Sequence, residues 1–395
     1  MKNLMNSLLM ITALMLIFSS CEKETTDPIT DIHITKDITE NTTWQAQYVY
    51  YVDVSIDVTN AATLTIEPGT TIKFGQGKSL TISYAGSSSG NIKANGTKEK
   101  PIVFTSQADV KSKGDWNGIW LYTGANASEF NYCIFEYAGG SGWSGGEGAI
   151  TINLAKNVSI DNCIFENSES YGVRVYQSRL GLNSFTGNTF NNNEINDLKL
   201  YAYNVSHIGE GNIFSKDIDV FSSDVDAPGD VVWAKQNANY ILFGEVSVGS
   251  GTGTKLIIEA GASLKFNENS HITIAYSSSN FAMIEAIGTA TEPIHFTSSS
   301  ANPSKGDWNS ITFYDGSSSG SVFDYCNFSD GGGYSGAPAM IVFKYQQGST
   351  TTIKNSSFSN SEGYGIMLDQ VNSDTNYPSL FNNTFSNNTL GDMNW

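Results

Sequence analysis

Short runs of alternating apolar and polar residues fill most of the chain beyond residue 43. Within residues 62–84 (ATLTIEPGTTIKFGQGKSLTISY), three such runs each place two apolar side chains on one face. Pro68 and Gly69 separate the first two runs and fit the central positions of a type II turn. Apolar spacing typical of a helix is missing from this part of the chain. The pattern therefore predicts short β-strands joined by tight turns. The apolar pairs are Leu64/Ile66, Ile72/Phe74 and Leu80/Ile82.

A phenylalanine with polar neighbours recurs at intervals of 24 to 30 residues. Such periods indicate solenoids or propellers, but a propeller needs four antiparallel strands in each blade and a longer, constant period. Three short strands per repeat instead predict an all-β, right-handed parallel β-helix, in which stacked coils align like side chains in columns. The phenylalanines are Phe135, Phe165, Phe190 and Phe214, then Phe328, Phe358 and Phe385.

The chain is also internally duplicated. The pentapeptide KGDWN occurs at residues 113–117 and again, 192 residues later, at 305–309. The patterns PIxFTS and LxIExG repeat with the same offset. We expect a first β-helix half at residues 44–220, a linker at 221–230 and a second half at 231–395. The sequence leaves open whether the halves form one continuous solenoid or two abutting lobes.

The repeated pentapeptide predicts structure rather than catalysis, because a catalytic motif would rarely need two copies. Asp115 and Asp307 are expected to be corner residues that bond local backbone groups, as aspartate often does. Trp116 and Trp308 are expected to anchor an edge or a cap of the solenoid.

The segments LTIEPGTTIKF, PIVFTS, GDWNGIW and NYCIFEYAGG give the chain a family resemblance. It resembles the right-handed parallel β-helix repeat proteins, which include pectate-lyase-like enzymes and many surface lipoproteins. The enzymes of this fold are polysaccharide lyases and hydrolases, and a lyase needs a base, usually arginine or lysine. Arg174 is the only arginine on a predicted strand, but its counterpart in the second copy is Met367. We therefore expect a salt bridge or a solvent-facing side chain at Arg174, and assign no catalytic residue.

The N-terminus is predicted to be a targeting segment. Residues 1–20 combine Lys2, a short apolar stretch and two small residues before Cys21. The stretch is too short for a comfortable membrane span. It resembles a bacterial lipoprotein signal peptide, which implies lipid on Cys21 and a place in the outer membrane. The polar residues 21–43 are expected to form a flexible tether of the kind that leads some lipoproteins to the cell surface.

Charge narrows the range of partners. The 395 residues carry a formal net charge of −18, and only two of the 21 basic residues are arginines. This balance disfavours nucleic acid, which needs clustered cations, and strongly anionic polysaccharides, which arginine usually binds. The acidic residues 215–230 supply oxygen ligands suited to Ca²⁺ but lack the spacing of an EF-hand loop. A solvated linker is expected there, with no metal site and no cofactor.

Three cysteines remain once Cys21 is assigned to lipid: Cys133, Cys163 and Cys326. Their neighbourhoods are typical of strands, and an odd number cannot pair fully within one chain. We expect them to be small buried side chains. A disulfide between Cys133 and Cys163 is the alternative.

Two glycine-rich loops lie at matching places, residues 138–148 and 331–339, and hold Trp143 and Tyr334 respectively. A flat exposed ring suits stacking against a sugar, which makes both residues candidates for ligand binding. Alternatively, the rings fold over a sheet edge as a lid. We expect a non-catalytic, lipid-anchored surface protein that presents a rigid face to extracellular polysaccharide or a protein partner. An extracellular polysaccharide lyase or glycoside hydrolase is the alternative.

Overall fold

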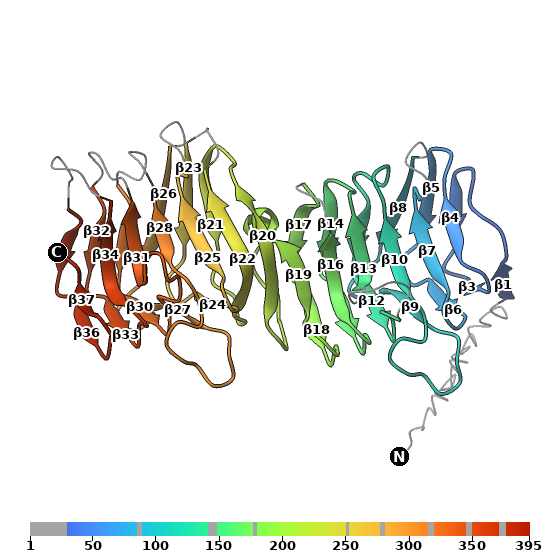
Figure 1. Ribbon diagram of the computed structural model, residues 1–395. Coiled ribbons are helices and arrows are strands. Elements are labelled where there is room, and N and C mark those ends of the chain that lie inside the picture. Colours follow the sequence, from blue (N-terminus) through green and yellow to red (C-terminus); the bar gives the residue numbers. More distant parts are fainter. Residues whose placement is uncertain are drawn as a thin grey trace, which may run out of the picture.

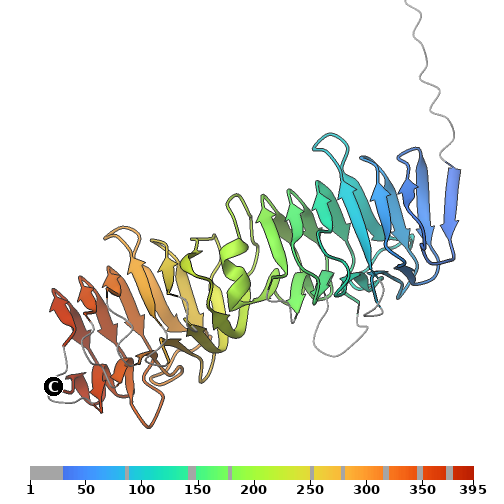
Figure 2. The ribbon, with the colours of Figure 1, turned by 90° about the horizontal axis from the view of Figure 1, so that it is seen from above.

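Parallel strands wind the chain into an elongated solenoid, with β1 (Thr30–Ile34) at one end and β37 (Gly391–Met393) at the other (Figure 1). Figure 2 shows the stacked coils from above. The described part of the chain holds one short 3₁₀ helix, η1 (Ala202–His207), and every strand pairing within it is parallel. The computed structural model describes residues 30–84, 89–140, 148–176, 180–249, 253–276, 281–314, 320–344, 350–370 and 377–395.

Three sheets enclose the first copy, and the chain passes through them in turn once per coil. Sheet A consists of β1, β3 (Tyr48–Val52), β6 (Thr71–Phe74), β9 (Ile102–Ser106), β12 (Cys133–Glu136), β15 (Ile164–Glu166) and β18 (Thr189–Asn191). Sheet B begins with β4 (Ile56–Val58), β7 (Ser79–Ile82), β10 (Gly118–Leu121), β13 (Gly148–Asn153), β16 (Tyr171–Tyr176), β19 (Leu198–Tyr201), β20 (Ile218–Val225) and β22 (Tyr240–Val248). Sheet C consists of β2 (Thr42–Trp44), β5 (Ala62–Ile66), β8 (Gly90–Asn95), β11 (Glu129–Asn131), β14 (Val158–Asp161) and β17 (Leu182–Thr186).

In the second copy, sheet B continues as two branches beside sheet D. Branch 1 consists of β24 (Ser263–Phe266), β27 (Ile294–Ser298), β30 (Cys326–Ser329), β33 (Ser357–Ser359) and β36 (Thr384–Ser386). Branch 2 consists of β25 (His271–Ile274), β28 (Ile311–Phe313), β31 (Ala339–Lys344), β34 (Tyr364–Asp369) and β37. Sheet D consists of β21 (Gly229–Trp233), β23 (Thr254–Ile258), β26 (Ala282–Ile287), β29 (Val322–Asp324), β32 (Thr352–Lys354) and β35 (Ser379–Phe381). The prediction of an all-β, internally duplicated parallel β-helix is confirmed.

The predicted phenylalanine columns are present in the core. In the first copy, the ring of Phe165 lies 4.9 Å from that of Phe135 and 5.1 Å from that of Phe190, in nearly parallel planes. In the second copy, the rings of Phe328 and Phe358 lie 4.7 Å apart. These spacings match the distance between paired strands, so each coil stacks the same side chain on the one before it.

Asparagines at the turns form the bonds between successive coils. The side-chain amide of Asn192 donates to the Asn167 side chain at 2.7 Å, and Asn387 donates to Asn360 at 2.6 Å. All four adopt a left-handed backbone, with φ between 53° and 58°. Asparagine tolerates this conformation better than most residues do, so it suits a turn that must repeat in every coil.

The repeated KGDWN segment is a structural corner, as predicted. Asp115 Oδ2 accepts hydrogen bonds from the Ser106 hydroxyl at 2.6 Å and from the Ser112 backbone amide at 2.9 Å. Asp307 makes the matching bonds, with the Ser298 hydroxyl at 2.6 Å and a backbone amide at 2.9 Å. The carboxylate therefore closes the loop between two faces of the solenoid in each copy.

The neighbouring tryptophans are core anchors. Trp116 and Trp308 are fully buried, and their rings stack on Phe74 and Phe266 at centroid distances of 4.1 and 4.3 Å. Each indole Nε1 donates to a backbone carbonyl 2.8 Å away. A buried indole usually requires such a partner, so the same device secures the corner in both copies.

The three cysteines are buried and free. The alternative of a disulfide between Cys133 and Cys163 is therefore wrong. The Cys133 and Cys163 thiols instead each lie 3.2 Å from a backbone carbonyl oxygen, and the Cys326 thiol lies 3.3 Å from one. Burial raises the pKa of the Cys133 thiol well above its usual range, which keeps it protonated as a small apolar side chain.

The segment expected to be a linker, residues 221–230, is built into the solenoid. Its first half belongs to β20, which pairs with β19 on one side and β22 on the other, and its end begins β21. Val225 points into the core and is 1% exposed. The apolar positions in this acidic segment still alternate with polar ones, which lets it complete a coil instead of looping out.

At the junction of the two copies, sheet B does not continue only into its own counterpart in the second copy. Through sheet B, Leu198 pairs with Ile218, Ile218 with Tyr240, and Tyr240 with Leu264 on β24. By the 192-residue offset, β24 corresponds to β6, which lies in sheet A. Sheet B of the first copy thus leads into the phenylalanine sheet of the second copy. The long strand β22 also pairs with β25, so it feeds both branches.

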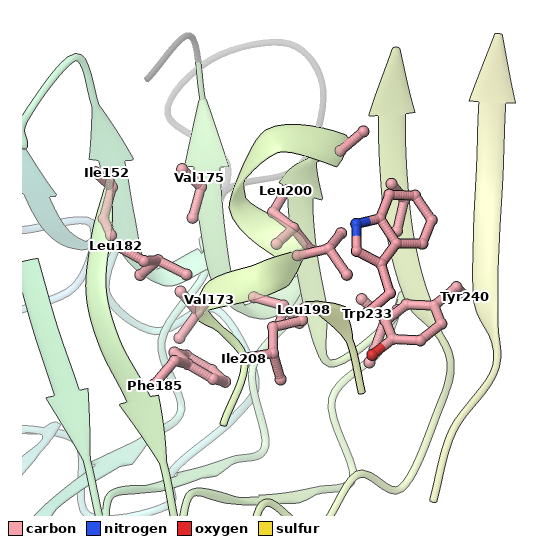
Figure 3. Packing of buried hydrophobic residues seen from close by; sticks show 14 of the residues in the cluster. Ile152, Val173, Val175, Leu182, Phe185, Leu198, Leu200, Ile208, Trp233 and Tyr240 are labelled. Carbon is pink, nitrogen blue, oxygen red and sulfur yellow. The ribbon is translucent and has the colours of Figure 1, made fainter. Parts of the chain in front are cut away.

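The core continues through this junction. Val173 and Leu198 of the first copy and Trp233 and Tyr240 of the second belong to one cluster of buried apolar side chains, with Ile208 between them (Figure 3). Four of these five side chains are fully buried, and Ile208 is 3% exposed. The molecule is therefore one continuous solenoid rather than two abutting lobes.

Candidate ligand-binding face

Only one of the two predicted ligand-binding residues, Tyr334, lies within the described part of the chain. Trp143 lies outside the described residues, as does Cys21. Tyr334 is 48% exposed, and its ring centroid lies 5.4 Å from the Lys344 ammonium nitrogen on β31. Lys344 also approaches the Tyr314 ring, at 6.0 Å. Tyr334 therefore belongs to a patch on the outer face of branch 2 that holds a second tyrosine and a cation.

The glycine-rich loop around Tyr334 covers part of the same face. Ala337 packs against Ala339 and Val342 in a small apolar cluster outside the main core, with Tyr364 and Met367 beside it. The loop residue Ala337 and the strand residue Val342 are at most 1% exposed. The loop thus acts as a lid over this part of the sheet, while the Tyr334 ring stays half exposed.

Sequence reasoning missed a pair of tyrosines that occurs in both copies. Tyr84 and Tyr122 lie 5.3 Å apart between ring centroids, and Tyr276 and Tyr314, exactly 192 residues later in the chain, lie 5.1 Å apart. The outer members, Tyr84 and Tyr276, are 59% and 65% exposed. Core packing does not account for two such rings. We call these pairs the first and second tyrosine platforms.

The backbone turns the outer tyrosines toward solvent. Ser83 and Ala275 precede them, and both adopt a left-handed conformation, with φ of 64° and 54°. This conformation is uncommon for residues other than glycine, asparagine and aspartate, so two occurrences at matching positions mark a repeated feature. The sequence signal was present in the matching segments SLTISY and HITIAY, which both end on tyrosine.

An outward-facing row of aromatic side chains runs from the first platform along sheet B as far as β22. The apolar residue before each row member points into the core, and the row members stay partly exposed. Phe221 and Phe243 lie 4.8 Å apart and stack nearly in parallel. We call this set the outer aromatic row; it comprises Trp120, Tyr122, Tyr176, Tyr201, Phe221 and Phe243.

Ionisable groups gather beside the middle of the row. The Tyr171 hydroxyl donates to Asp219 Oδ2 at 2.9 Å, and the Asn196 side-chain amide donates to Asp219 Oδ1 at 2.7 Å. The Lys199 ammonium nitrogen lies 4.2 Å from the Phe221 ring centroid. Burial, followed by the nearby Asp219 carboxylate, raises the pKa of Tyr171. Burial also raises the pKa of Asp219, against the lowering effect of its two hydrogen-bond donors.

Arg174 lies in the same region, on β16. Its side chain is 9% exposed, and its guanidinium carbon lies 4.7 Å from the centroid of the Tyr176 ring. The solvent-facing position considered from the sequence is therefore excluded. Along the sheet it pairs in register with Lys199, so two cations lie on adjacent strands against aromatic rings.

Within the described residues, no group of three or more histidine, cysteine, aspartate or glutamate side chains is arranged to hold a metal ion. This includes the acidic segment 215–230, which was weighed as a Ca²⁺ site. The same part of the chain contains no helix with the length and apolar character needed to cross a membrane.

A family model for the pectate-lyase like beta helix domain matches residues 36–146 and 225–319, which together make up more than half of the chain. The chain belongs to this family. The two matched stretches fall in the two copies, in agreement with the duplication.

Two solved structures are similar along nearly the whole chain. The A-module of the mannuronan C-5 epimerase AlgE4 from Azotobacter vinelandii is 11% identical, with a TM-score of 0.23, and the alignment covers 93% of this chain and 89% of that one. The surface protein and adhesin PfbA from Streptococcus pneumoniae is 10% identical, with a TM-score of 0.20 and coverage of 92% and 91%. No curated protein matches the sequence.

Proposed function

We propose that this protein is a lipid-anchored β-helix protein of the bacterial cell surface that binds extracellular polysaccharide and does not catalyse its conversion. The binding face is the outer surface of sheet B and of its branch 2. The rigid stack of coils holds this face in a fixed shape, so a ligand binds without ordering loops first.

The observation that carries the proposal is the recurrence of the tyrosine platforms. Tyr84 and Tyr276 are each more than half exposed, yet both copies keep them beside a second ring. A tyrosine offers a flat apolar face for stacking and a hydroxyl for hydrogen bonds, which suits a sugar that has both surfaces. Tyr334 and Lys344 extend the second platform, and Trp143 remains a candidate in the first copy.

The anchor follows from the N-terminal segment. Lipid on Cys21 would hold the solenoid at the outer membrane, with the residues between Cys21 and β1 as the tether. The second part of the segment expected to be a flexible tether, residues 30–43, instead contributes β1 and the start of β2 to the solenoid. Expression of the full chain and of Cys21→Ala in a Gram-negative host with labelled palmitate tests this. We expect label and outer-membrane localisation for the full chain and neither for the variant. Equal label in both would refute lipidation at Cys21.

A polysaccharide array probed with the detergent-solubilised full chain tests the binding function. We expect binding to at least one extracellular polysaccharide, reduced in Tyr84→Ala and Tyr276→Ala and, to a smaller extent, in Trp143→Ala and Tyr334→Ala. Phe381→Ala is the matched control, because Phe381 is 57% exposed but lies on sheet D. Binding that survives all four platform substitutions would refute the assigned face.

An extracellular polysaccharide lyase or glycoside hydrolase is the second candidate. The observation in its favour is the cluster of Tyr171, Arg174, Lys199 and Asp219, because it brings groups capable of proton transfer onto the same face. Incubation with uronate and neutral polysaccharides in the presence of Ca²⁺ tests this candidate. Steady formation of unsaturated products or of new reducing ends would replace the binding function with an enzymatic one.

A further inference from the structure

We propose that the ligand is a linear, uncharged polysaccharide and that one chain of it contacts both tyrosine platforms at once. This inference rests on the proposed function and specifies its ligand. The platforms lie on the two copies of a single solenoid whose core runs without a break from one to the other. Their positions relative to each other are therefore fixed by the fold.

The number of strands between the platforms sets the length of the ligand. Tyr84 lies two residues after the end of β7, and Tyr276 lies two residues after the end of β25. Sheet B leads from β7 to β25 in seven steps, through β10, β13, β16, β19, β20 and β22. At roughly 4.8 Å per step, the platforms are about 34 Å apart along the solenoid. A disaccharide reaches one platform, whereas an extended polymer reaches both.

The surface between the platforms is suited to a polymer lying along it. The outer aromatic row places a ring on five of the six intervening strands, from Trp120 on β10 to Phe243 on β22, and only β13 has none in the row. The second platform lies further along β22, at the level of Val248, which pairs with Ile274 of β25. The central rings are partly buried, and Phe221 and Phe243 stack on each other, which leaves less of their faces open to a ligand. We therefore expect the main stacking contacts at the two ends and weaker contacts between them.

The charges of the protein favour an uncharged polymer as the ligand. The chain carries a net charge of −18, which disfavours a polyanion as its ligand. The cations on the binding face already have neighbours of their own. Lys344 Nζ lies 3.4 Å from Asp369, and Arg174 and Lys199 pack against aromatic rings. A polymer bearing hydroxyl groups alone matches these conditions.

Contact with two platforms changes affinity in a measurable way. Once one end is bound, the other end meets the second platform at a high effective concentration, and such linkage raises affinity by about 10² to 10⁴-fold. Calorimetric titration of the detergent-solubilised full chain with β-1,4-linked gluco-, manno- and xylo-oligosaccharides, from dimers to decamers, measures this. We expect two short oligomers per protein, one long oligomer per protein, and a Kd at least about 100-fold lower for the long one.

Variants separate the possible outcomes. Tyr276→Ala is expected to reduce the affinity for a long oligomer to that for a short one, while one short oligomer still binds at the first platform. Phe381→Ala is expected to change neither value. Because Tyr276 is 65% exposed, its substitution leaves the core intact, which circular dichroism checks.

Two results would overturn the inference while leaving the proposed function in place. One is an identical Kd and two-site stoichiometry at every length. The other is tighter binding of oligogalacturonates than of the uncharged oligomers. If no oligomer and no polysaccharide on the array binds, the proposed function itself fails.

Discussion

Arg174 on β16 and Met367 on β34 occupy corresponding places in the two copies, but their surroundings differ. Arg174 lies over the Tyr176 ring, beside the polar cluster around Asp219. Met367 lies beside Val342 and Ala337, in the apolar cluster beneath the glycine-rich loop. At this one place on the outer face, the side chains are therefore polar and ionisable in the first copy but apolar and covered in the second.

The corner residues, in contrast, have the same surroundings in both copies. Asp115 and Asp307 accept hydroxyl hydrogen bonds of the same length, 2.6 Å, and the two buried tryptophans donate over the same 2.8 Å. Inward and corner side chains must match the coils above and below them, whereas outward side chains have fewer neighbours to satisfy. Differences between the copies are therefore the best guide to function, together with exposed residues that both copies keep.

The largest expected loss of stability comes from substituting a core residue that both copies share. Trp116→Ala and Trp308→Ala each remove a fully buried ring that stacks on a phenylalanine. We expect each to lower the free energy of unfolding by about 3–5 kcal/mol, as measured by urea denaturation. If only one of the two variants lost stability, the corner would not have the same role in the two copies.

The corner carboxylates should have a smaller effect. Asp115→Ala leaves the Ser106 hydroxyl and a backbone amide without their partner, and Asp307→Ala does the same in the second copy. We expect each to cost about 1–3 kcal/mol in the same measurement. Asp109→Ala, at an exposed position in the first corner loop, is the control and should be neutral. A neutral result for Asp115→Ala would contradict the assigned role.

Introducing a single hydroxyl group tests whether the glycine-rich loop covers the outer face of the second copy. Val342→Thr places a polar group beneath Ala337, in a cluster that is fully apolar. We expect a loss of about 1–2 kcal/mol by thermal denaturation, because a buried hydroxyl needs a partner. Thr151 occupies the matching place in the first copy and accepts a hydrogen bond from the Gly148 amide at 3.0 Å. An unchanged melting temperature for Val342→Thr would mean that the loop does not close over this face.

The smallest effect depends on pH and belongs to the first copy. Burial raises the pKa of Asp219, so the folded state favours its protonated form. Its stabilising contribution is complete below the ordinary aspartate pKa of about 4 and is lost as pH rises through the raised value. Asp219→Asn keeps an acceptor for Tyr171 and removes the charge. We expect the variant to match the parent at acidic pH and to become the more stable of the two toward neutral pH. The reverse order in urea denaturation would contradict this account.

Much of the scaffold could be predicted from the sequence because it rests on periodic residues. The phenylalanine intervals predicted the columns, and the repeated pentapeptide predicted the corners at Asp115 and Asp307. The junction could not be predicted in this way. Whether sheet B continues into the counterpart of sheet A or of itself depends on pairing between distant strands, such as β22 with β24 and β25, which no local pattern encodes.

The candidate site was harder to predict. Tyr334 was predicted because it stands alone among glycines, but the platform it extends depends on Ala275, as the first platform depends on Ser83. Neither residue type favours a left-handed backbone, so the turn that exposes Tyr84 and Tyr276 comes from the surrounding fold rather than from local preference. The matching SLTISY and HITIAY segments would have been informative if exposed tyrosines had been sought in both copies.

The most direct test of the account is equilibrium binding of an uncharged polysaccharide that the array identifies, measured for the full chain and for the double variant Tyr84→Ala/Tyr276→Ala. We predict that the double variant binds at least about tenfold more weakly, as expected when central aromatic contacts are removed, and that its melting temperature is unchanged. Equal affinity in the two proteins would contradict the claim that the tyrosine platforms form the binding face.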